Sequence, residues 1–206
     1  MSILKQTFVE LISRYKEDDR LADELWNEIE INYSKKKRHY HTLEHLQNLL
    51  NQLSEVKDQI KGWDAVLFSL FYHDVIYNPL KSDNEERSAD HAEKRLQEIL
   101  VPKRIVENCK AQILATKKHG ASSDMDVNFF TDADLSILGS EWNLYSAYFK
   151  QVRKEYSIYP DLIYNPGRKK VLLHFLQMER IFKTDYFNNK FELQAKQNLQ
   201  QELELL

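Results

Sequence analysis

The sequence predicts an all-α fold, and three observations support that prediction. Only four glycines and four prolines occur in 206 residues, too few for the many tight turns of a sheet protein. Apolar residues recur every three or four positions along most of the chain, as they do on one face of a helix. The alternating pattern of a half-buried strand is essentially absent. Since no repeat or linker divides the chain, we expect residues 1–206 to form one single-domain helical bundle.

The first half of the chain predicts four helices. Leucine, isoleucine and aromatic residues repeat at helical spacing over residues 4–15, 21–31 and 42–53, which predicts three amphipathic helices. Residues 63–76 are apolar on nearly all sides, and the length of this stretch favours a central buried helix over a strand. The Asn-Pro pair at 78–79 should end it.

The second half predicts six more helical segments. An Asp followed by acidic residues starts the segment at 83–100, and a proline suits the first turn of the segment at 102–118. An aromatic stripe marks the segment at 142–156. The stretch at 159–167 contains two prolines and is predicted to be a loop. The predicted segments cover residues 83–100, 102–118, 129–138, 142–156, 168–182 and 189–206.

Composition excludes several classes of protein. The net charge of −3 argues against a strong nucleic-acid footprint, and the basic run at 35–38 is better explained as a solvated loop. The single cysteine, Cys109, rules out a disulfide within the chain or a cysteine-based zinc cluster. The longest apolar run is about a dozen residues, whereas a membrane span needs about 20. The N-terminus does not resemble a signal peptide, so we expect a cytoplasmic protein without membrane contact. P-loop, Rossmann and nucleophile-elbow motifs are absent.

Three separated segments place ionisable side chains in or beside apolar stretches. They are YHTLEH at 40–45, the pair His73 and Asp74, and the DADL motif at 132–135. Unpaired polar groups are costly to bury, and one divalent cation would satisfy all three segments. Imidazole beside carboxylate suits Mn²⁺, Mg²⁺, Fe²⁺, Ni²⁺, Co²⁺ or Zn²⁺ without distinguishing them. The bland alternatives are a chance pair of histidines, a His–Asp hydrogen bond and an aspartate that caps a helix.

The order of these segments resembles that of the HD-domain superfamily of metal-dependent phosphohydrolases, which are all-α enzymes. YHTLEH resembles the YHNxxH motif of cyclic-nucleotide phosphodiesterases, and ADLS at 133–136 resembles a motif of the same enzymes. That similarity implies that His45 is a metal ligand, that His41 is a general acid, and that Asp134 rather than Asp132 is a ligand. The full ligand set that it implies is His45, His73, Asp74 and Asp134.

A bacterial group of predicted HD phosphohydrolases is similar over nearly the whole chain. The similarity includes RHYH at 38–41, NEERSA at 84–89, VRKEY at 152–156 and NL at 198–199. It implies a metal-site core at about 38–140, with residues 141–206 packed on it as C-terminal helices. It also implies hydrolysis of a small phosphorylated substrate, such as a nucleotide, with Asp74 or Asp134 orienting the attacking water. The alternatives are a non-catalytic module that binds metal or nucleotide, a di-iron oxygenase, and a purely structural helical protein.

Further residues are weaker candidates for substrate binding. Arginine can clamp phosphate through its planar fork, although an ordinary salt bridge is the commoner role. A histidine at a helix end and acids at a helix start also have simple structural explanations. The oligomeric state is open, and includes a homodimer. These candidates are Arg38, Arg153 and Arg168, together with His119, Glu85 and Glu86.

Overall fold

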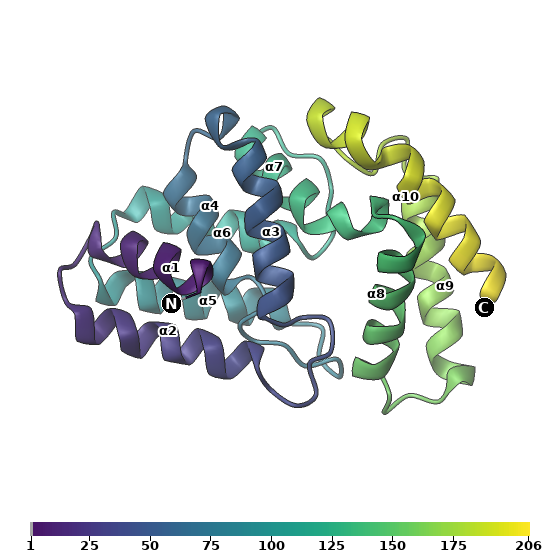
Figure 1. Cartoon of the computed structure of the whole chain (residues 1–206), viewed down its shortest axis with the longest axis horizontal. Coiled ribbons are helices and arrows are strands. Elements are labelled where there is room, and N and C mark those ends of the chain that lie inside the picture. The colour runs from purple at the N-terminus through teal and green to yellow at the C-terminus, as the bar shows by residue number, and fades with distance from the viewer. Residues whose placement is uncertain (1) are drawn as a thin grey trace.

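In the computed structural model, which describes residues 2–206, all regular structure of the described chain is helical (Figure 1). The all-α prediction is therefore confirmed. The helices are α1 (Ile3–Ser13), α2 (Asp19–Tyr33), α3 (Leu43–Glu55), η1 (Lys57–Gln59), α4 (Trp63–Tyr72), α5 (Asn84–Glu98), α6 (Lys103–Ala115), α7 (Met125–Asp134), η2 (Leu135–Gly139), α8 (Trp142–Glu155), α9 (Asp161–Gln177) and α10 (Asp185–Leu205). None of the helices in residues 2–206 combines the length and apolar character needed to cross a bilayer.

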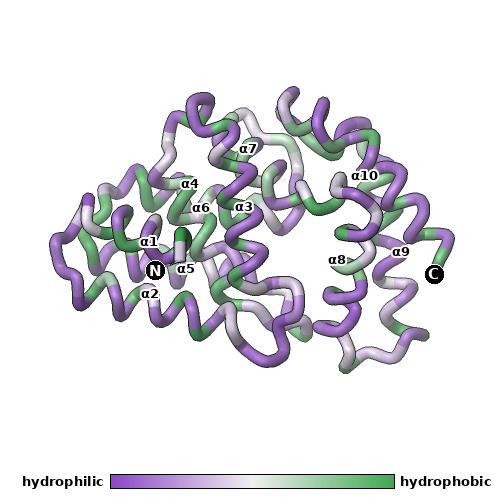
Figure 2. Tube along the Cα trace, viewed as in Figure 1, coloured by the Kyte–Doolittle hydropathy of each residue, from purple (hydrophilic) through white to green (hydrophobic). Residues whose placement is uncertain are grey.

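Helix α4 is the centre of the fold. Every residue from Ala65 to Tyr72 is buried, because the helix contacts α1, α3, α5, α6 and α7 on its different sides. A helix that is apolar all round can be stable only in such a position. Figure 2 shows the contrast between α4, which is mostly hydrophobic, and α2, which carries many hydrophilic residues on the outside of the molecule.

Helix α4 is shorter than the sequence predicts. It ends at Tyr72, with His73 as its C-terminal cap, instead of continuing to residue 76. The reason is a side chain of α5: the hydroxyl of Ser88 accepts from the N–H of Ile76 and donates to its carbonyl oxygen, both at 3.2 Å. These bonds replace the helical ones, so the chain leaves the helix after Tyr72, and His73 at its end stays buried.

Helices α8, α9 and α10 form the other side of the molecule, and α7 and η2 connect them to the body around α4 (Figure 1). Helix α10 lies against η2 at Gly139, where a Cβ atom would come within 2.5 Å of the Cβ of Phe191. Only glycine allows this approach. The amide of Asn198 donates to the carbonyl oxygens of Leu138 and Ser140 at 2.8 and 2.7 Å, which fixes α10 on η2.

The predicted loop at 159–167 is wrong, because α9 begins at Asp161 and includes Pro166. Proline fits the first turn of a helix but costs about 3 kcal/mol in its interior. Arg168, two residues after Pro166, is buried and pairs with Glu202 of α10 at 2.7 Å, which holds this part of α9 against α10.

The boundary between the last two helices also differs from the prediction. Helix α9 ends at Gln177 rather than at residue 182, and α10 begins at Asp185 rather than at 189. Carboxylates from two helices hold the intervening turn. Glu192 accepts from the N–H groups of Ile181 and Phe182, and Asp132 accepts from the next two N–H groups along the chain. Such long-range partners cannot be read from local periodicity.

Candidate metal centre and active site

Three helix ends meet at one point and bring together four of the predicted site residues. His45 lies in the first turn of α3, His73 and Asp74 follow the last residue of α4, and Asp134 is the last residue of α7. We call His45, His73, Asp74 and Asp134 the metal-site cluster. The Nε2 atoms of His45 and His73 are 3.1 Å apart. The Oδ2 atom of Asp74 lies 3.1 Å from Nε2 of His73, and Oδ1 of Asp134 lies 3.3 Å from Nε2 of His45.

The spacing of these donor atoms fits a single cation. Ligand atoms placed about 2.1 Å from one ion are separated by roughly 3.0 Å when adjacent and 4.2 Å when opposite. One donor atom from each of His45, His73 and Asp74 lies within 4.8 Å of the other two. Asp134 is outside this group of three, but its Oδ1 atom lies 3.3 and 3.8 Å from the two imidazole nitrogens.

The tautomer of His73 also favours a cation. Its Nδ1 atom lies 3.0 Å from the carbonyl oxygen of Leu70, so this nitrogen carries the proton that is donated. In the neutral ring, Nε2 is then a bare lone pair that faces another imidazole and two carboxylates. Such an arrangement is unfavourable unless a positive charge, either a proton or a metal ion, lies among these atoms.

The pKa values of the cluster also indicate that positive charge is favoured among these side chains. Burial alone would lower the pKa of His73, but the carboxylates of Asp74 and Asp134 outweigh it and raise the pKa to about 9. Burial would raise the pKa of both carboxyls, but the surrounding imidazoles lower the pKa of Asp74 and that of Asp134. The carboxylates therefore remain charged, and a metal ion would have to displace a proton from His73.

His41 stands beside the cluster and is held by a buried glutamate. Its Nδ1 atom lies 2.6 Å from Oε2 of Glu155, and its Nε2 atom faces Oδ2 of Asp74 at 3.9 Å. The hydroxyl of Tyr77 also donates to Oε2 of Glu155 at 3.0 Å. Burial lowers the pKa of His41, but Asp74 and Glu155 reverse this effect and raise it.

Glu155 is the site residue that the sequence reasoning missed. Its side chain is 0% exposed, and its Oε1 atom accepts from three successive backbone N–H groups, those of His39, Tyr40 and His41, at 2.7, 2.8 and 3.0 Å. These donors and His41 lower its pKa, against the effect of burial, to about 2. The available signal was its position on α8, three residues after Val152 on the aromatic stripe, where a carboxylate would not be expected.

His119 contacts the cluster through Asp134 and lines the larger cavity together with His41. Its Nε2 atom lies 3.0 Å from Oδ2 of Asp134, the oxygen that does not face His45. The residue has a φ of 50°, in the left-handed region, which only a minority of non-glycine residues adopt. His119 is thus a partner of Asp134 and belongs to the site.

The two aspartates of the DADL motif have different surroundings. Asp134 faces the imidazoles, whereas Asp132 points to the turn before α10 and is 0% exposed. Asp132 accepts from the N–H of Lys183 at 2.9 Å and from the N–H and hydroxyl of Thr184 at 2.7 and 2.8 Å, and it pairs with the Lys183 ammonium at 2.9 Å. The geometry agrees with the choice of Asp134 for the site.

The three candidate arginines lie outside the cluster, and other groups engage them. Arg38 is buried and donates to the carbonyl oxygens of His41 and Val75 at 3.3 and 3.0 Å, so it braces two segments that carry site residues. Arg153 binds Asp161 and two carbonyl oxygens. Arg168 makes a bidentate pair with Glu202 at 2.7 and 2.8 Å. Neither Arg153 nor Arg168 lines a cavity next to the cluster.

Of the two candidate glutamates, only Glu85 reaches the site. It lines the larger cavity beside the cluster, and its carboxylate lies 3.9 Å from the ammonium of Lys117. Glu86 is 46% exposed and pairs with the same lysine, outside the cavity.

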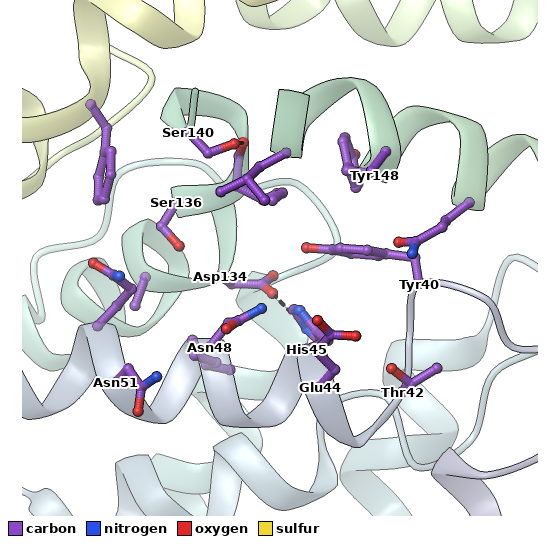
Figure 3. Close-up of a pocket in the computed structure, with 18 of the residues that line it drawn as sticks. Tyr40, Thr42, Glu44, His45, Asn48, Asn51, Asp134, Ser136, Ser140 and Tyr148 are labelled. Atoms are coloured by element: carbon purple, nitrogen blue, oxygen red, sulfur yellow. Dashed lines mark hydrogen bonds and ion pairs between the residues drawn. The ribbon is translucent and has the colours of Figure 1, made fainter. Parts of the chain in front are cut away.

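Two cavities meet at Asp134. The larger has a volume of about 810 Å³ and is bordered by His41, His73 and Asp74. The smaller, of about 320 Å³, is bordered by His45 and is lined by Asn48, Asn51 and Ser136 among others. Figure 3 shows this smaller cavity, with the carboxylate of Asp134 directed at His45 from the opposite wall. Tyr40 and Tyr148 line both cavities, so the cluster is accessible from two sides.

No protein-family model, curated protein or solved structure matches this chain.

Proposed function

We propose that the chain is a metal-dependent phosphohydrolase of the HD-domain type. Its substrate would be a phosphate ester of a nucleotide or of another small phosphorylated metabolite. The observation that carries this proposal is the pair of Nε2 atoms 3.1 Å apart, which face two carboxylates at the border of the cavities. These four side chains come from three separate helices, and their imidazole nitrogens and carboxylate oxygens face one another, which is the kind of donor set that binds a divalent cation.

The donor set suits a divalent cation with nitrogen and oxygen preferences. His45, His73, Asp74 and Asp134 would hold it, with His73 fixed by its bond to Leu70. When bound, such an ion neutralises charge on phosphoryl oxygens and lowers the pKa of water. With these two nitrogen and two oxygen ligands, an ion that accepts six ligands would also have room for substrate and water.

His41 is suited to protonate the leaving oxygen. Its Nδ1 proton is bound by Glu155, so Nε2 points into the larger cavity beside Asp74. The carboxylates of Asp74 and Glu155 favour the imidazolium form, which can donate the Nε2 proton. Glu155 positions His41 and does not itself border either cavity.

The reaction then balances with the residues present. Water oriented by Asp74, which borders the larger cavity, attacks phosphorus and releases a proton to solvent. The bond from phosphorus to the leaving oxygen breaks, and that oxygen takes the Nε2 proton of His41. Inorganic phosphate and an alcohol or a shorter phosphate are released, and His41 regains its proton from solvent. Charge stabilisation and positioning provide most of the catalysis in phosphoryl transfer.

A metal titration coupled to phosphate release tests this proposal. The protein is stripped with a chelator, and Mn²⁺, Mg²⁺, Fe²⁺, Co²⁺, Ni²⁺ and Zn²⁺ are added back singly with p-nitrophenyl phosphate and a panel of nucleotides. We expect about one cation to bind per cluster and phosphate release to follow occupancy. His73→Ala should abolish both. His91→Gln is the matched control, since His91, on α5, pairs with Glu28 of α2 and borders neither cavity.

Two outcomes would contradict the proposal in different ways. Turnover by metal-free protein would remove the role of the cluster in the chemistry. Stoichiometric metal binding with no phosphate release from any substrate of the panel would instead favour a non-catalytic binding module.

A further inference from the structure

The two cavities that meet at the cluster differ sharply in charge. The larger is bordered by four lysines, Lys81, Lys117, Lys118 and Lys170. The smaller has no lysine or arginine among the described residues that line it, and carries amides such as Asn48, Asn51 and Gln151 instead. A chain with a net charge of −3 therefore concentrates cations around one of its two cavities.

Three of these lysines are available to a ligand. Lys117 donates to the carbonyl oxygen of Ser82 at 2.6 Å and forms an ion pair with Glu86, so the protein itself neutralises its charge. Lys81, Lys118 and Lys170 are exposed, and no carboxylate in residues 2–206 lies within 4.0 Å of any of the three. They come from separate segments: the turn after α4, the turn after α6, and α9.

The proposed function leaves this positive charge unexplained. A divalent ion would balance the charges of Asp74 and Asp134, and Lys117 lies 3.9 Å from Glu85, the remaining carboxylate of the cavity. The scissile phosphate would lie at the cluster. Three ammonium groups at the border of the cavity remain, and ammonium groups form charge-assisted bonds with phosphate oxygens.

The position of His41 shows which part of a substrate would meet these lysines. His41 borders the larger cavity and is absent from the lining of the smaller one. The leaving oxygen must lie near Nε2 of His41, so the leaving group extends into the cavity with the lysines. A volume of about 810 Å³ lies within the usual range for a small-molecule site, roughly 300–1,000 Å³, so it has room for more than one phosphate.

We propose, resting on the phosphohydrolase function above, that the substrate carries a second phosphate on its leaving group and that Lys118 and Lys170, with Lys81, bind it. The substrate class is thus a bisphosphate or diphosphate of a small molecule rather than a simple monophosphate. The amide-lined cavity on the other side of Asp134 has no cation to hold that group.

Matched substrates test this inference. Each pair joins a monophosphate with its doubly phosphorylated form: adenosine monophosphate with adenosine diphosphate and with the adenosine bisphosphate, and fructose 6-phosphate with fructose bisphosphate. We expect kcat/KM to be at least about tenfold higher for the doubly phosphorylated member of one or more pairs. Since ammonium–phosphate attraction is screened by salt, this ratio should fall as ionic strength rises.

A double variant identifies the residues. Lys118→Gln with Lys170→Gln should reduce the ratio within the preferred pair by about tenfold or more. Lys94→Gln is the matched control, because Lys94 is exposed on α5 and borders neither cavity, and it should keep the wild-type ratio. Calorimetric binding of the preferred compound to metal-loaded His41→Asn protein, with and without the two lysine substitutions, gives a second measurement that needs no turnover.

The failures are distinguishable. If monophosphates are hydrolysed as well as their doubly phosphorylated forms, or if the double variant keeps the wild-type ratio, this inference is overturned and the hydrolase function stands. If no phosphate ester is hydrolysed with any cation, the hydrolase function fails and the inference fails with it.

Discussion

The two sides of helix α7 bury a carboxylate in opposite ways. Asp132 and Asp134 are the same residue type, two positions apart, and the side chain of each is at most 14% exposed. Asp132 has four donors, including a lysine ammonium, and borders neither cavity. Asp134 faces only imidazole nitrogens, at 3.0 to 3.8 Å, and borders both cavities.

The difference teaches how to separate structural from functional charge in this fold. A closed group of charges, such as Asp132 with Lys183, satisfies every member from within the protein. Arg168 and Glu202 form a second closed group, with Tyr145 as a third member. The metal-site cluster is open, because its imidazole lone pairs face one another and the carboxylates, so that a proton or a metal ion must lie among them. Removing one member of a closed group should therefore lower the stability of the protein. Removing one member of the metal-site cluster should lower its activity.

The largest expected effect is on activity, at Asp134. Asp134→Ala should lower kcat/KM for phosphate release by about 10³-fold or more, equivalent to about 4 kcal/mol, because the cation loses a ligand. Metal content by mass spectrometry should fall with it, while circular dichroism keeps the wild-type helix signal. Wild-type turnover in this variant would contradict the role of Asp134 as a metal ligand.

The second effect is on stability, at Asp132. Asp132→Ala leaves the Lys183 ammonium and two backbone N–H groups without their acceptor, so we expect a loss of about 3–5 kcal/mol in the free energy of unfolding. Denaturation in urea measures it, and the protein that remains folded should still bind metal. Asp161→Ala breaks an exposed pair with Arg153 and provides the control, at about 1 kcal/mol or less. A loss no greater than that of the control would mean that Asp132 is not part of a closed group.

Glu155 contributes both to the stability of the fold and to the proposed chemistry. Its contribution to stability should depend on pH. The pKa of Glu155 is about 2 in the folded protein, against 4.5 as its ordinary value. Its contribution, about 3 kcal/mol, is complete above pH 4.5 and is lost as the pH falls toward 2. The difference in unfolding free energy between wild type and Glu155→Gln should therefore be largest near neutral pH and shrink in acid. A difference that stays constant from pH 7 to 3 would contradict this assignment.

The functional part of Glu155 should appear in kinetics. Glu155→Gln removes the negative charge that favours the imidazolium form of His41, so kcat should fall by about 10–100-fold. The basic limb of the pH–rate profile should move to lower pH, since the pKa of His41 drops. Metal affinity should change little, because Glu155 does not touch the metal-site cluster. A uniform loss of kcat with an unmoved pH profile would indicate distortion alone.

The smallest effect is expected at Arg153. The sequence makes it a candidate phosphate clamp, but its guanidinium binds Asp161 and the carbonyl oxygens of Tyr156 and Tyr159. Arg153→Gln should cost about 1 kcal/mol of stability and leave kcat/KM for phosphate release within about twofold. A tenfold rise in KM in this variant would instead support Arg153 as a phosphate-binding residue.

Much of this architecture could be predicted from the sequence, for physical reasons. Apolar periodicity is local, so it predicted the helices of the body well. It failed at 159–167, where α9 includes Pro166 and the helix is paired through Arg168 with Glu202 of α10, 34 positions away. Buried ionisable residues are rare enough to stand out within apolar segments, which is why His73 and Asp134 could be singled out. Their role as ligands remains a prediction.

The rest depends on contacts between segments far apart in sequence. Glu155 reaches His41 across 114 positions, and no local pattern links the two. The cation-rich cavity is assembled from lysines in three separate segments, each unremarkable alone. The sequence made Arg153 and Arg168 candidates for phosphate binding, but in the structure each pairs with a carboxylate of the protein, Asp161 and Glu202 respectively.

The backbone bonds of Glu155 have a consequence for how α8 and the site depend on each other. One of its oxygens anchors residues 39–41, and the other binds the imidazole of His41. Shortening the side chain by one methylene would withdraw both supports together. The backbone path of residues 39–41 into α3 and the pKa of His41 therefore depend on the same side chain, so a shift of α8 would alter both together.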